Sequence, residues 1–312
     1  MSISTNPKSD QLQDSILNSD PLSTLLRELR FGANVFFRSQ YCGQWGVNTS
    51  GHQQVSFHLV AEGESWLHGF SETPQRLIAG QLVMFPHDST HLLSNSDKRP
   101  ETDRINAEPP ERIEGKSTRL ICGLFTFDQA AVKPLLASLP DAVILDLSQD
   151  NNPSARTLVN HWIFEAANDQ AGSDVAVDRL AELVFIEILR SEIRQGHLDG
   201  AFGALGDVQL GKVLAVIHEQ PGVLHSVRAM ADLAGMSESA FTQKFKRLVG
   251  MSCGKYVKHW RMQTAARALA ESGRSITDIA EATGYESEAA FRKAFRAHFD
   301  IAPGKYRRES IA

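Results

Sequence analysis

The spacing of apolar residues changes once along the 312-residue chain, near residue 150. Before that point, short β-branched and aromatic runs alternate with polar turns, which is typical of strands. The runs are NVFFRSQYCGQWGV, VSFHLVAEGESWLHGF, QRLIAG, QLVMFP and STRLICGLFTFD, and one helical segment, PLSTLLREL, precedes them. From about residue 153 the apolar residues recur every three or four positions, which predicts helices. The pattern therefore predicts an α+β chain, with strands first and an all-α part after them.

Polar segments divide the chain into parts. Residues 1–20 predict a disordered lead, and residues 96–116, with three prolines, predict a long exposed loop. Helices over 153–195 are apolar around much of their circumference, so we expect them to pack against a domain or a partner subunit. We assign residues 21–148 to one domain, 149–204 to a helical linker and dimerisation region, and 205–312 to a second domain.

The charge is distributed unevenly between these parts. The whole chain carries a net charge of −5, which alone argues against nucleic-acid binding. Residues 205–312, however, contain 16 Lys and Arg against 11 Asp and Glu, which leaves them at +5 and the rest at −10. A basic domain on an acidic body is expected where only that domain meets phosphate.

Targeting signals and a cysteine framework are not evident in the sequence. We find no run of 18 apolar residues and no apolar signal-peptide core, so no membrane association is expected. Three cysteines are too few and too scattered for the disulfide framework of a secreted protein. We expect a cytoplasmic protein.

An internal repeat in the basic part relates residues 230–257 to residues 279–307. Each copy has a short apolar helix, a glycine turn and a second helix opened by a serine, which is the pattern of a helix-turn-helix. The aligned pairs are Gly235 with Gly284, Phe241 with Phe291, Phe245 with Phe295, Gly254 with Gly304 and Tyr256 with Tyr306. The alternative is a structural helical bundle with a solvated basic face, which a single pattern of this kind would not exclude. Two copies in the basic part of the chain favour DNA binding.

The solvent-facing side of each second helix gives the expected DNA contacts. Residues near the start of such a helix reach base edges, whereas later basic residues meet phosphate. Glutamine suits adenine, and arginine or lysine suits guanine. A connecting helix with Lys258 on its surface would hold the second helices of the two copies, which we call the first and second reader, about one DNA turn, roughly 34 Å, apart. The expected contacts are Ser239, Thr242, Gln243, Lys246, Arg247 and Lys258 with the first reader, and Glu288, Ala289, Arg292, Lys293 and Arg296 in the second.

The segment WRMQTAARALAESGRSITDIAEATGYESEAAFRKAFRAHFDIAPGKYR resembles the C-terminal signature of the AraC/XylS family of bacterial transcriptional regulators. The resemblance covers about 100 residues and includes Ile279 and Ala280 before Gly284, with Pro303 near the end. It implies binding to promoter DNA, contact with RNA polymerase, a homodimer and, most often, activation. One departure is Cys253, where the family often has proline, and we expect it to loosen one turn.

The first domain resembles the cupin-type sensory domain of AraC-like regulators, which implies a small barrel of jelly-roll type. The stretch GQLVMFPHDSTHLLSN (80–95) raises the question of a metal-dependent enzyme, because its Gly, Pro, His and Asn match the second cupin motif. The first motif, however, retains only one histidine. A metal would rest on His58, Glu62 and His91, fewer dependable ligands than zinc or iron prefers. We therefore expect no cofactor and no catalysis.

Several residues of this barrel could instead receive a signal. Trp45, His58, Trp66 and His91 could line a pocket for a small apolar or acidic effector. Cys42 and Cys122 could form a redox switch if they converge, although buried cysteines more often act as small hydrophobes. The sequence thus predicts a DNA-binding regulator with a sensory cupin that detects a small-molecule or redox signal, and the resemblance implies an activator. The alternative is a cupin metal-dependent enzyme, such as a dioxygenase, fused to a DNA-binding tail.

Overall fold

The computed structural model describes residues 20–108, 115–127, 136, 139–147, 153–168, 170–196, 200–223 and 226–311. The expected disordered lead, apart from residue 20, and part of the expected loop at 96–116 lie outside these residues. Residues 20–30 form one compact unit with the residues after 195, and residues 31–195, apart from Leu136, form the other. Among the described residues, no helix combines the length and the apolar character needed to cross a bilayer.

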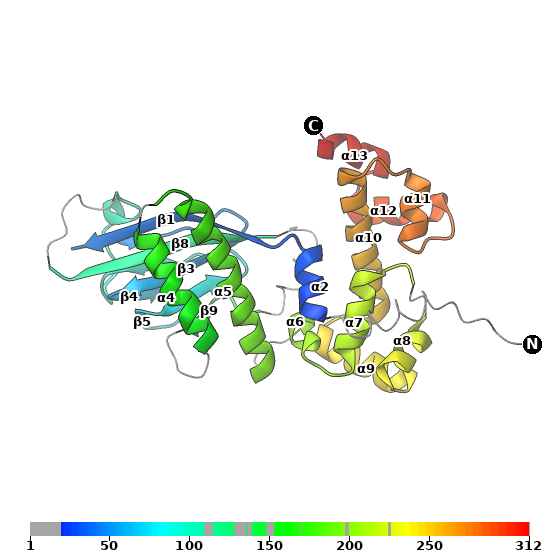
Figure 1. The fold of residues 1–312 in the computed structure, drawn as a ribbon, viewed down its shortest axis with the longest axis horizontal. Helices are drawn as coiled ribbons and strands as arrows, with labels where there is room; N and C mark the ends of the chain where they lie inside the picture. The colour runs from blue at the N-terminus through cyan, green and yellow to red at the C-terminus, as the bar shows by residue number, and fades with distance from the viewer. Residues whose placement is uncertain are drawn as a thin grey trace, which may run out of the picture. The chain divides into compact units, whose positions relative to one another are not determined.

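Two antiparallel sheets make up the first part of the barrel unit (Figure 1). The larger has the order β1-β8-β3-β6-β9 and the smaller β2-β7-β4-β5. Strands β7 and β9 are too short to stand out in the sequence pattern, but the predicted double-sheet architecture is confirmed. The strands are β1 (Gly32–Cys42), β2 (Gly46–Val47), β3 (Val55–Glu62), β4 (Glu64–His68), β5 (Gln75–Ile78), β6 (Gln81–Phe85), β7 (Leu92–Ser94), β8 (Ser117–Thr126) and β9 (Val143–Asp146).

Alternating residues of the strands fill the space between the two sheets. Side chains of one strand face alternate sides, so one set enters this core and the other faces outward. The core contains Tyr41, Trp45, Val47, Val60, Leu67, Leu77, Val83, Phe85, Leu93, Leu120 and Cys122.

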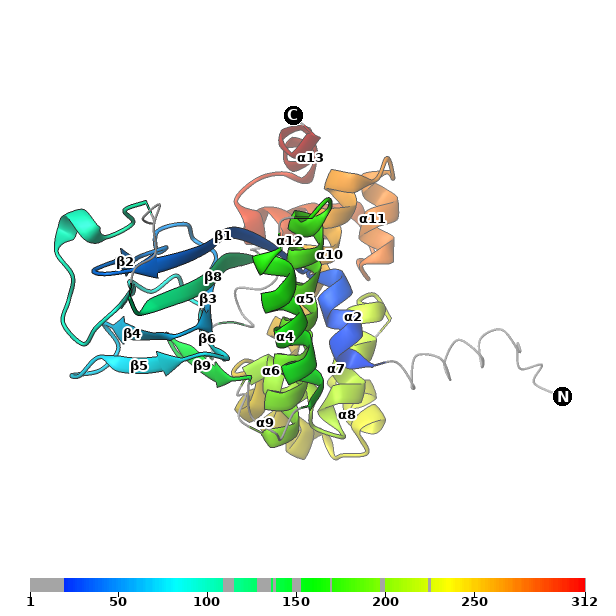
Figure 2. The same ribbon diagram turned by 60° about the vertical axis from the view of Figure 1, so that its left-hand side comes forward.

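Two helices, α4 (Pro153–Ala167) and α5 (Ser173–Gln195), cover the outer face of the larger sheet (Figure 2). The ring of Phe57 lies 5.7 Å from Trp162 of α4, and Phe125 lies 4.5 Å from Phe185 of α5. The buried stripe of these helices therefore packs on their own barrel. The assignment of residues 149–204 to a separate linker is corrected accordingly, because α4 and α5 belong to the barrel unit.

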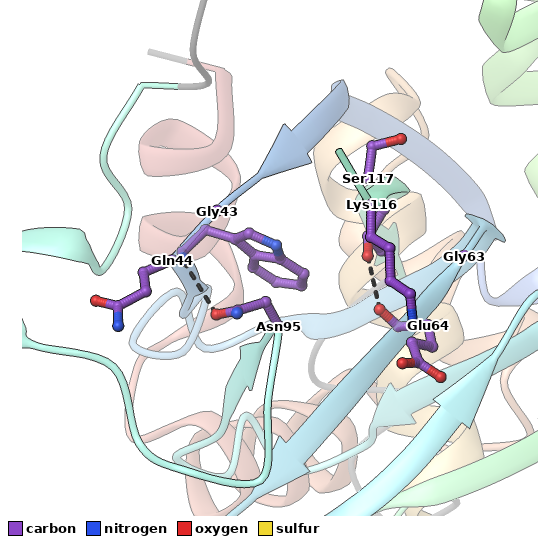
Figure 3. A pocket seen from close by; sticks show the side chains of 9 residues that line it. Gly43, Gln44, Gly63, Glu64, Asn95, Lys116 and Ser117 are labelled. Atoms are coloured by element: carbon purple, nitrogen blue, oxygen red, sulfur yellow. Dashed lines mark hydrogen bonds between the residues drawn. The ribbon is translucent and has the colours of Figure 1, made fainter. Parts of the chain in front are cut away.

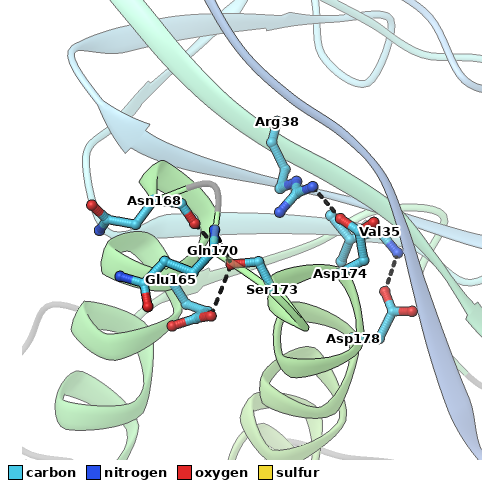
Figure 4. Close-up of polar contacts among 8 residues, drawn as sticks. All are labelled: Val35, Arg38, Glu165, Asn168, Gln170, Ser173, Asp174 and Asp178. Atoms are coloured by element: carbon cyan, nitrogen blue, oxygen red, sulfur yellow. Dashed lines mark hydrogen bonds and ion pairs between the residues drawn. The ribbon is translucent and has the colours of Figure 1, made fainter.

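Polar contacts fix the start of α5 against β1 (Figure 4). The register between β1 and β8 shifts at Val35, and its N–H group donates to the carboxylate of Asp178 at 2.7 Å. Arg38 forms an ion pair with Asp174, one helical turn earlier. These contacts satisfy a strand N–H group at an irregular point of the sheet and set the position of the helix.

The helical unit begins with a segment from the N-terminal part of the chain, α2 (Pro21–Glu28). Serine hydroxyls accept hydrogen bonds from the first turns of α8, α9, α10, α11 and α12, and among them Ser237 and Ser287 are the serines predicted to open the second helix of each repeat. The remaining helices are α6 (Gly200–Leu205), α7 (Leu210–Glu219), α8 (Val227–Ala234), α9 (Glu238–Val249), α10 (Cys253–Glu271), α11 (Ile276–Ala282), α12 (Glu288–Phe299) and α13 (Pro303–Ile311).

Helix α2 packs on α7 rather than on the strands that follow it. Its leucines recur at three and four positions, and Leu25 and Leu29 are completely buried. Thr24 donates to the carboxylate of Glu219, in α7, at 3.0 Å. By its contacts, the segment 20–30 therefore groups with the helical unit.

Candidate nucleic-acid interface and effector site

Each helix-turn-helix is built as its sequence predicts. Gly235, between α8 and α9, has a φ of 64°, and Gly284, between α11 and α12, has a φ of 80°. Only glycine adopts this left-handed conformation readily, which explains its place at both turns. The four repeat phenylalanines are completely buried, so each recognition helix turns its opposite face outward; they are Phe241, Phe245, Phe291 and Phe295.

The predicted DNA contacts lie on the outward face of α9, α10 and α12. The five residues of α9 and Lys258 of α10 are exposed, and so are four of the five residues of α12. Glu288 is half-buried. Its carboxylate accepts hydrogen bonds from Thr277 at 2.5 Å and from Arg292 at 2.6 Å. These hydrogen bonds, the one from Thr277 first, lower the pKa of Glu288 and keep it ionised.

Helix α10 connects the two helix-turn-helix motifs. Its 19 residues span about 28 Å at 1.5 Å per residue. At its centre Arg261 donates to the carbonyl of Pro221 at 2.7 Å and to that of Gly284 at 3.3 Å. A Cβ atom on Gly284 would lie 2.9 Å from the backbone Cα of Gly222 and 2.8 Å from the Arg261 guanidinium, and the left-handed φ of Gly284 also favours glycine at this turn. Arg261 therefore positions the second motif on α10.

The departure at Cys253 does not loosen the fold. Cys253 is the first residue of α10, where an N–H group needs no partner within the helix and proline is favoured. Ser252 caps this helix by accepting from Lys255, and the thiol is buried against the Met230 sulfur at 3.1 Å. Burial raises the pKa of Cys253 to about 12. The expected loosening of this turn is thus not found.

The position of α9 depends on Lys244, which the sequence pattern does not single out. Its ammonium lies 2.8 Å from the carboxylate of Asp207 and donates to Gln209 at 2.9 Å. The same carboxylate accepts from the N–H of Leu210 at the start of α7. Lys244 therefore faces the protein rather than DNA, although it lies among basic residues of a recognition helix.

In the barrel, His58 and His91 lie together inside the core. Their Nε2 atoms are 3.0 Å apart, and the hydroxyl of Thr49 lies 3.0 Å and 3.1 Å from them. The Nδ1 atom of His91 donates to the Ser89 carbonyl, which leaves its Nε2 as an acceptor. The ring of Phe85 stacks on His91 with 3.7 Å between centroids. Burial lowers the pKa of both histidines, so both are neutral at pH 7.

A cupin implies a bound metal, but the residues present do not fit a divalent ion. Glu62 is exposed and lies 3.3 Å from Arg119, four positions and about 13 Å along β3 from His58. Among the described residues, no three His, Cys, Asp or Glu side chains converge as metal ligands do. Two neutral imidazoles and the hydroxyl of Thr49 would leave a doubly charged ion uncompensated in an apolar core. Of the predicted set, His58 and His91 lie together, and Glu62 lies apart from them.

A pocket of about 760 Å³ opens at one end of the barrel (Figure 3). Trp45 forms part of its wall, although its side chain is largely buried in the core between the sheets, and its backbone N–H donates to the side chain of Asn95 at 3.3 Å. The lining also includes Gln44, Lys116 and Glu64, so the pocket combines an aromatic residue with amide, ammonium and carboxylate groups, and the Glu64 carboxylate is paired with Arg76. Of the predicted effector contacts, only Trp45 lies here. His58 and His91 are closed off in the core, and Trp66 is half-buried on β4.

The two barrel cysteines do not converge. In the β1–β8 register Cys122 lies opposite Phe37, and Cys42 lies opposite Ser117. Five residues, about 17 Å along the sheet, therefore separate Cys42 from the position opposite Cys122. A disulfide needs Cα atoms within about 7 Å, so these cysteines cannot bond in this fold. Cys122 is completely buried, and burial raises the pKa of its thiol.

Comparisons with known proteins agree with both units. A family model described as "Cupin" matches residues 20–194, and one described as "Helix-turn-helix domain" matches residues 230–309. An uncharacterized HTH-type transcriptional regulator of Haemophilus influenzae is 31% identical over 298 residues, which cover 91% of this chain and 96% of that protein.

Two further relatives carry functional names. The HTH-type transcriptional regulator MtrA of Neisseria gonorrhoeae is 28% identical, over 86% of this chain and 91% of its own length. The RCS-specific HTH-type transcriptional activator RclR of Escherichia coli is 26% identical, over 81% and 84%. In this chain a cupin barrel is followed in sequence by two helix-turn-helix motifs that one helix joins. The chain belongs to the AraC family of DNA-binding transcriptional regulators.

Proposed function

We propose that this regulator binds promoter DNA sequence-specifically through α9 and α12 and acts as an activator that recruits RNA polymerase. The observation that supports this most directly is the exposure of a polar and basic face on two recognition helices whose opposite faces are completely buried. Gln243 of α9 suits adenine, and Arg292 or Lys293 of α12 suits guanine. The activator role is supported by the name of the relative RclR.

Binding to the DNA upstream of the protein's own gene tests the proposal. Replacing Arg292 by alanine should weaken specific binding by about 1–3 kcal/mol and relax the preference at one base pair. An Arg292→Ala variant with unchanged affinity and footprint would rule out this assignment.

We further propose that the Trp45 pocket receives a small-molecule effector. The flat indole suits an aromatic or unsaturated portion of the effector, while Lys116 and Asn95 offer donors to an acidic or polar group. A screen of small acids by tryptophan fluorescence would test this, with Trp45→Phe as the variant and Trp66→Phe, outside the pocket, as its control. A hit that quenches both variants equally would argue against this pocket.

A redox signal is the second candidate for what the barrel senses. Cys42 and Cys122 lie too far apart to form a disulfide in this fold, which counts against a disulfide switch between them. A thiol count before and after mild oxidation distinguishes the two signals. An internal disulfide would require β1 to shift against β8, whereas oxidation of Cys42 alone would leave the register intact.

The outer side of α4 and α5 is our proposed dimer surface. It exposes three large apolar side chains, Phe164, Val175 and Leu183, with exposed fractions of 58%, 64% and 47%. Large apolar side chains exposed on neighbouring helices support a surface that a partner covers. Leu183→Glu should shift sedimentation from dimer to monomer, and an unchanged dimer would place the interface elsewhere.

We propose no catalytic activity for the cupin. The alternative, a metal-dependent enzyme fused to a DNA-binding part, needs a ligand set that Glu62 does not complete. Metal analysis of the purified protein separates the two, because an enzyme of this class would hold near-stoichiometric iron or zinc.

A further inference from the structure

Three polar side chains of α11 and α12 are linked by hydrogen bonds, and the corresponding described residues of the first helix-turn-helix are bonded differently. Thr277, on α11, donates to one carboxylate oxygen of Glu288 at 2.5 Å, and the Nε of Arg292 donates to the other at 2.6 Å. The repeat places Glu238 and Thr242 at the corresponding positions of α9. There, Thr242 donates to the backbone carbonyl of Glu238 at 2.7 Å instead.

Arg292 donates to Glu288 through its Nε atom, and this determines which of its N–H groups remain available to DNA. Its guanidinium has five N–H donors, of which the single Nε donor points to Glu288. One N–H of each terminal nitrogen points away from the side chain along the guanidinium plane, and this end-on pair, the terminal fork, remains available for O6 and N7 of guanine. Both oxygens of Glu288 are engaged, so the carboxylate fixes this fork rather than contacting a base itself.

We propose that Glu288 is a positioning residue for DNA readout, held by Thr277, which presents the terminal fork of Arg292 to a guanine in the major groove. A positioned arginine loses less side-chain freedom on binding than a mobile one. The negative charge of Glu288 also repels phosphate, so it lowers binding to DNA that lacks the guanine. The two effects together raise specificity, and this inference rests on the proposed DNA-binding function.

The roles of the ion pair predict opposite effects on two kinds of DNA. Glu288→Gln should weaken binding to the preferred duplex about 10-fold, because Arg292 loses its fixed orientation. The same change should strengthen binding to a scrambled duplex by roughly 2- to 5-fold, because a negative charge is lost near phosphate. A role limited to helix stability would move both affinities in the same direction, since an acidic first turn stabilises the helix in either complex.

The experiment uses the full chain and a duplex that the wild-type protein selects from a random 30-base-pair pool. Each G·C pair of that duplex is changed in turn to A·T, and the affinity of each altered duplex is measured for the wild-type chain and for Arg292→Ala. The pair whose change weakens wild-type binding but not Arg292→Ala binding contains the base that Arg292 contacts. Discrimination at this pair is then measured for Glu288→Gln, for Thr277→Val, and for Glu288→Gln combined with Arg292→Ala. Glu238→Gln, which removes the same charge at the same position of α9, is the matched control.

We expect Thr277→Val to lose less discrimination than Glu288→Gln. We also expect no further loss when Glu288→Gln is added to Arg292→Ala, because the two residues act through the same interaction. Glu238→Gln should strengthen binding to both duplexes alike. Unchanged discrimination in Glu288→Gln, or tighter binding to the preferred duplex, would overturn the inference, since the ion pair would then be irrelevant or would hold Arg292 back. Failure of the wild-type chain to select any duplex would instead refute the proposed function.

Discussion

Replacing Leu25 by alanine tests whether α2 is part of the DNA-binding unit. Leu25 precedes the barrel in sequence but is completely buried in the helical unit, where α2 packs on α7. Removing a buried leucine side chain costs about 2–5 kcal/mol, from lost burial and the cavity left behind. A value of 3 kcal/mol corresponds to a roughly 100-fold larger population of the opened helix pair.

Hydrogen exchange measured helix by helix gives the required resolution. We expect Leu25→Ala to reduce protection about 100-fold in α7 and to leave the β3 amides unchanged. Arg27→Ala, an exposed change in the same helix, should alter neither. Loss of protection in β3 with α7 intact would refute the assignment of α2, and unchanged protection in both would show that α2 contributes no stability.

Three further predictions follow from the two units. Burial lowers the pKa of His58 and His91, so the unfolded chain binds more protons below about pH 6.5. The unfolding free energy of the barrel should therefore fall as the pH drops from 6.5 to 5.5, by at most about 1 kcal/mol for each histidine, and denaturant titrations that show no loss would contradict the buried neutral pair. Lys258→Ala should weaken binding to all DNA sequences and reduce the salt slope by about 0.9, which affinity measured at several salt concentrations would check. Phe291→Ala should cost about 3–5 kcal/mol in α12 and its neighbours, so thermal unfolding that matches the wild type would refute its place in that core.

The helix-turn-helix part was predictable because its signals are local. A serine cap, a four-residue spacing of phenylalanine and a glycine turn each act within one or two helical turns, and the structure has all of them. The exposed face of each recognition helix then follows from helix geometry. The role of Lys244 did not follow, because its partner Asp207 is 37 residues earlier and nothing in the local pattern distinguishes it from Lys246.

The barrel shows why pairing over longer distances was harder to predict. The contact of His58 with His91 depends on how β3 and the loop after β6 are placed, and Thr49 completes it from a third segment. Glu62 was predicted as a ligand, yet the register of β3 on β8 shifts between Val60 and Glu62, and Glu62 ends opposite Arg119. The leucine spacing of α2 indicated a buried face but carried no information about its partner.

Hydroxyl-radical footprinting of the selected duplex tests the central claim most directly, that one chain presents two recognition helices to DNA. We expect two protected tracts per chain, about 10 base pairs apart on one face of the duplex. Arg292→Ala should weaken only the tract bound by α12, and Gln243→Ala only the tract bound by α9. A single tract per chain, or both variants weakening the same tract, would contradict the account.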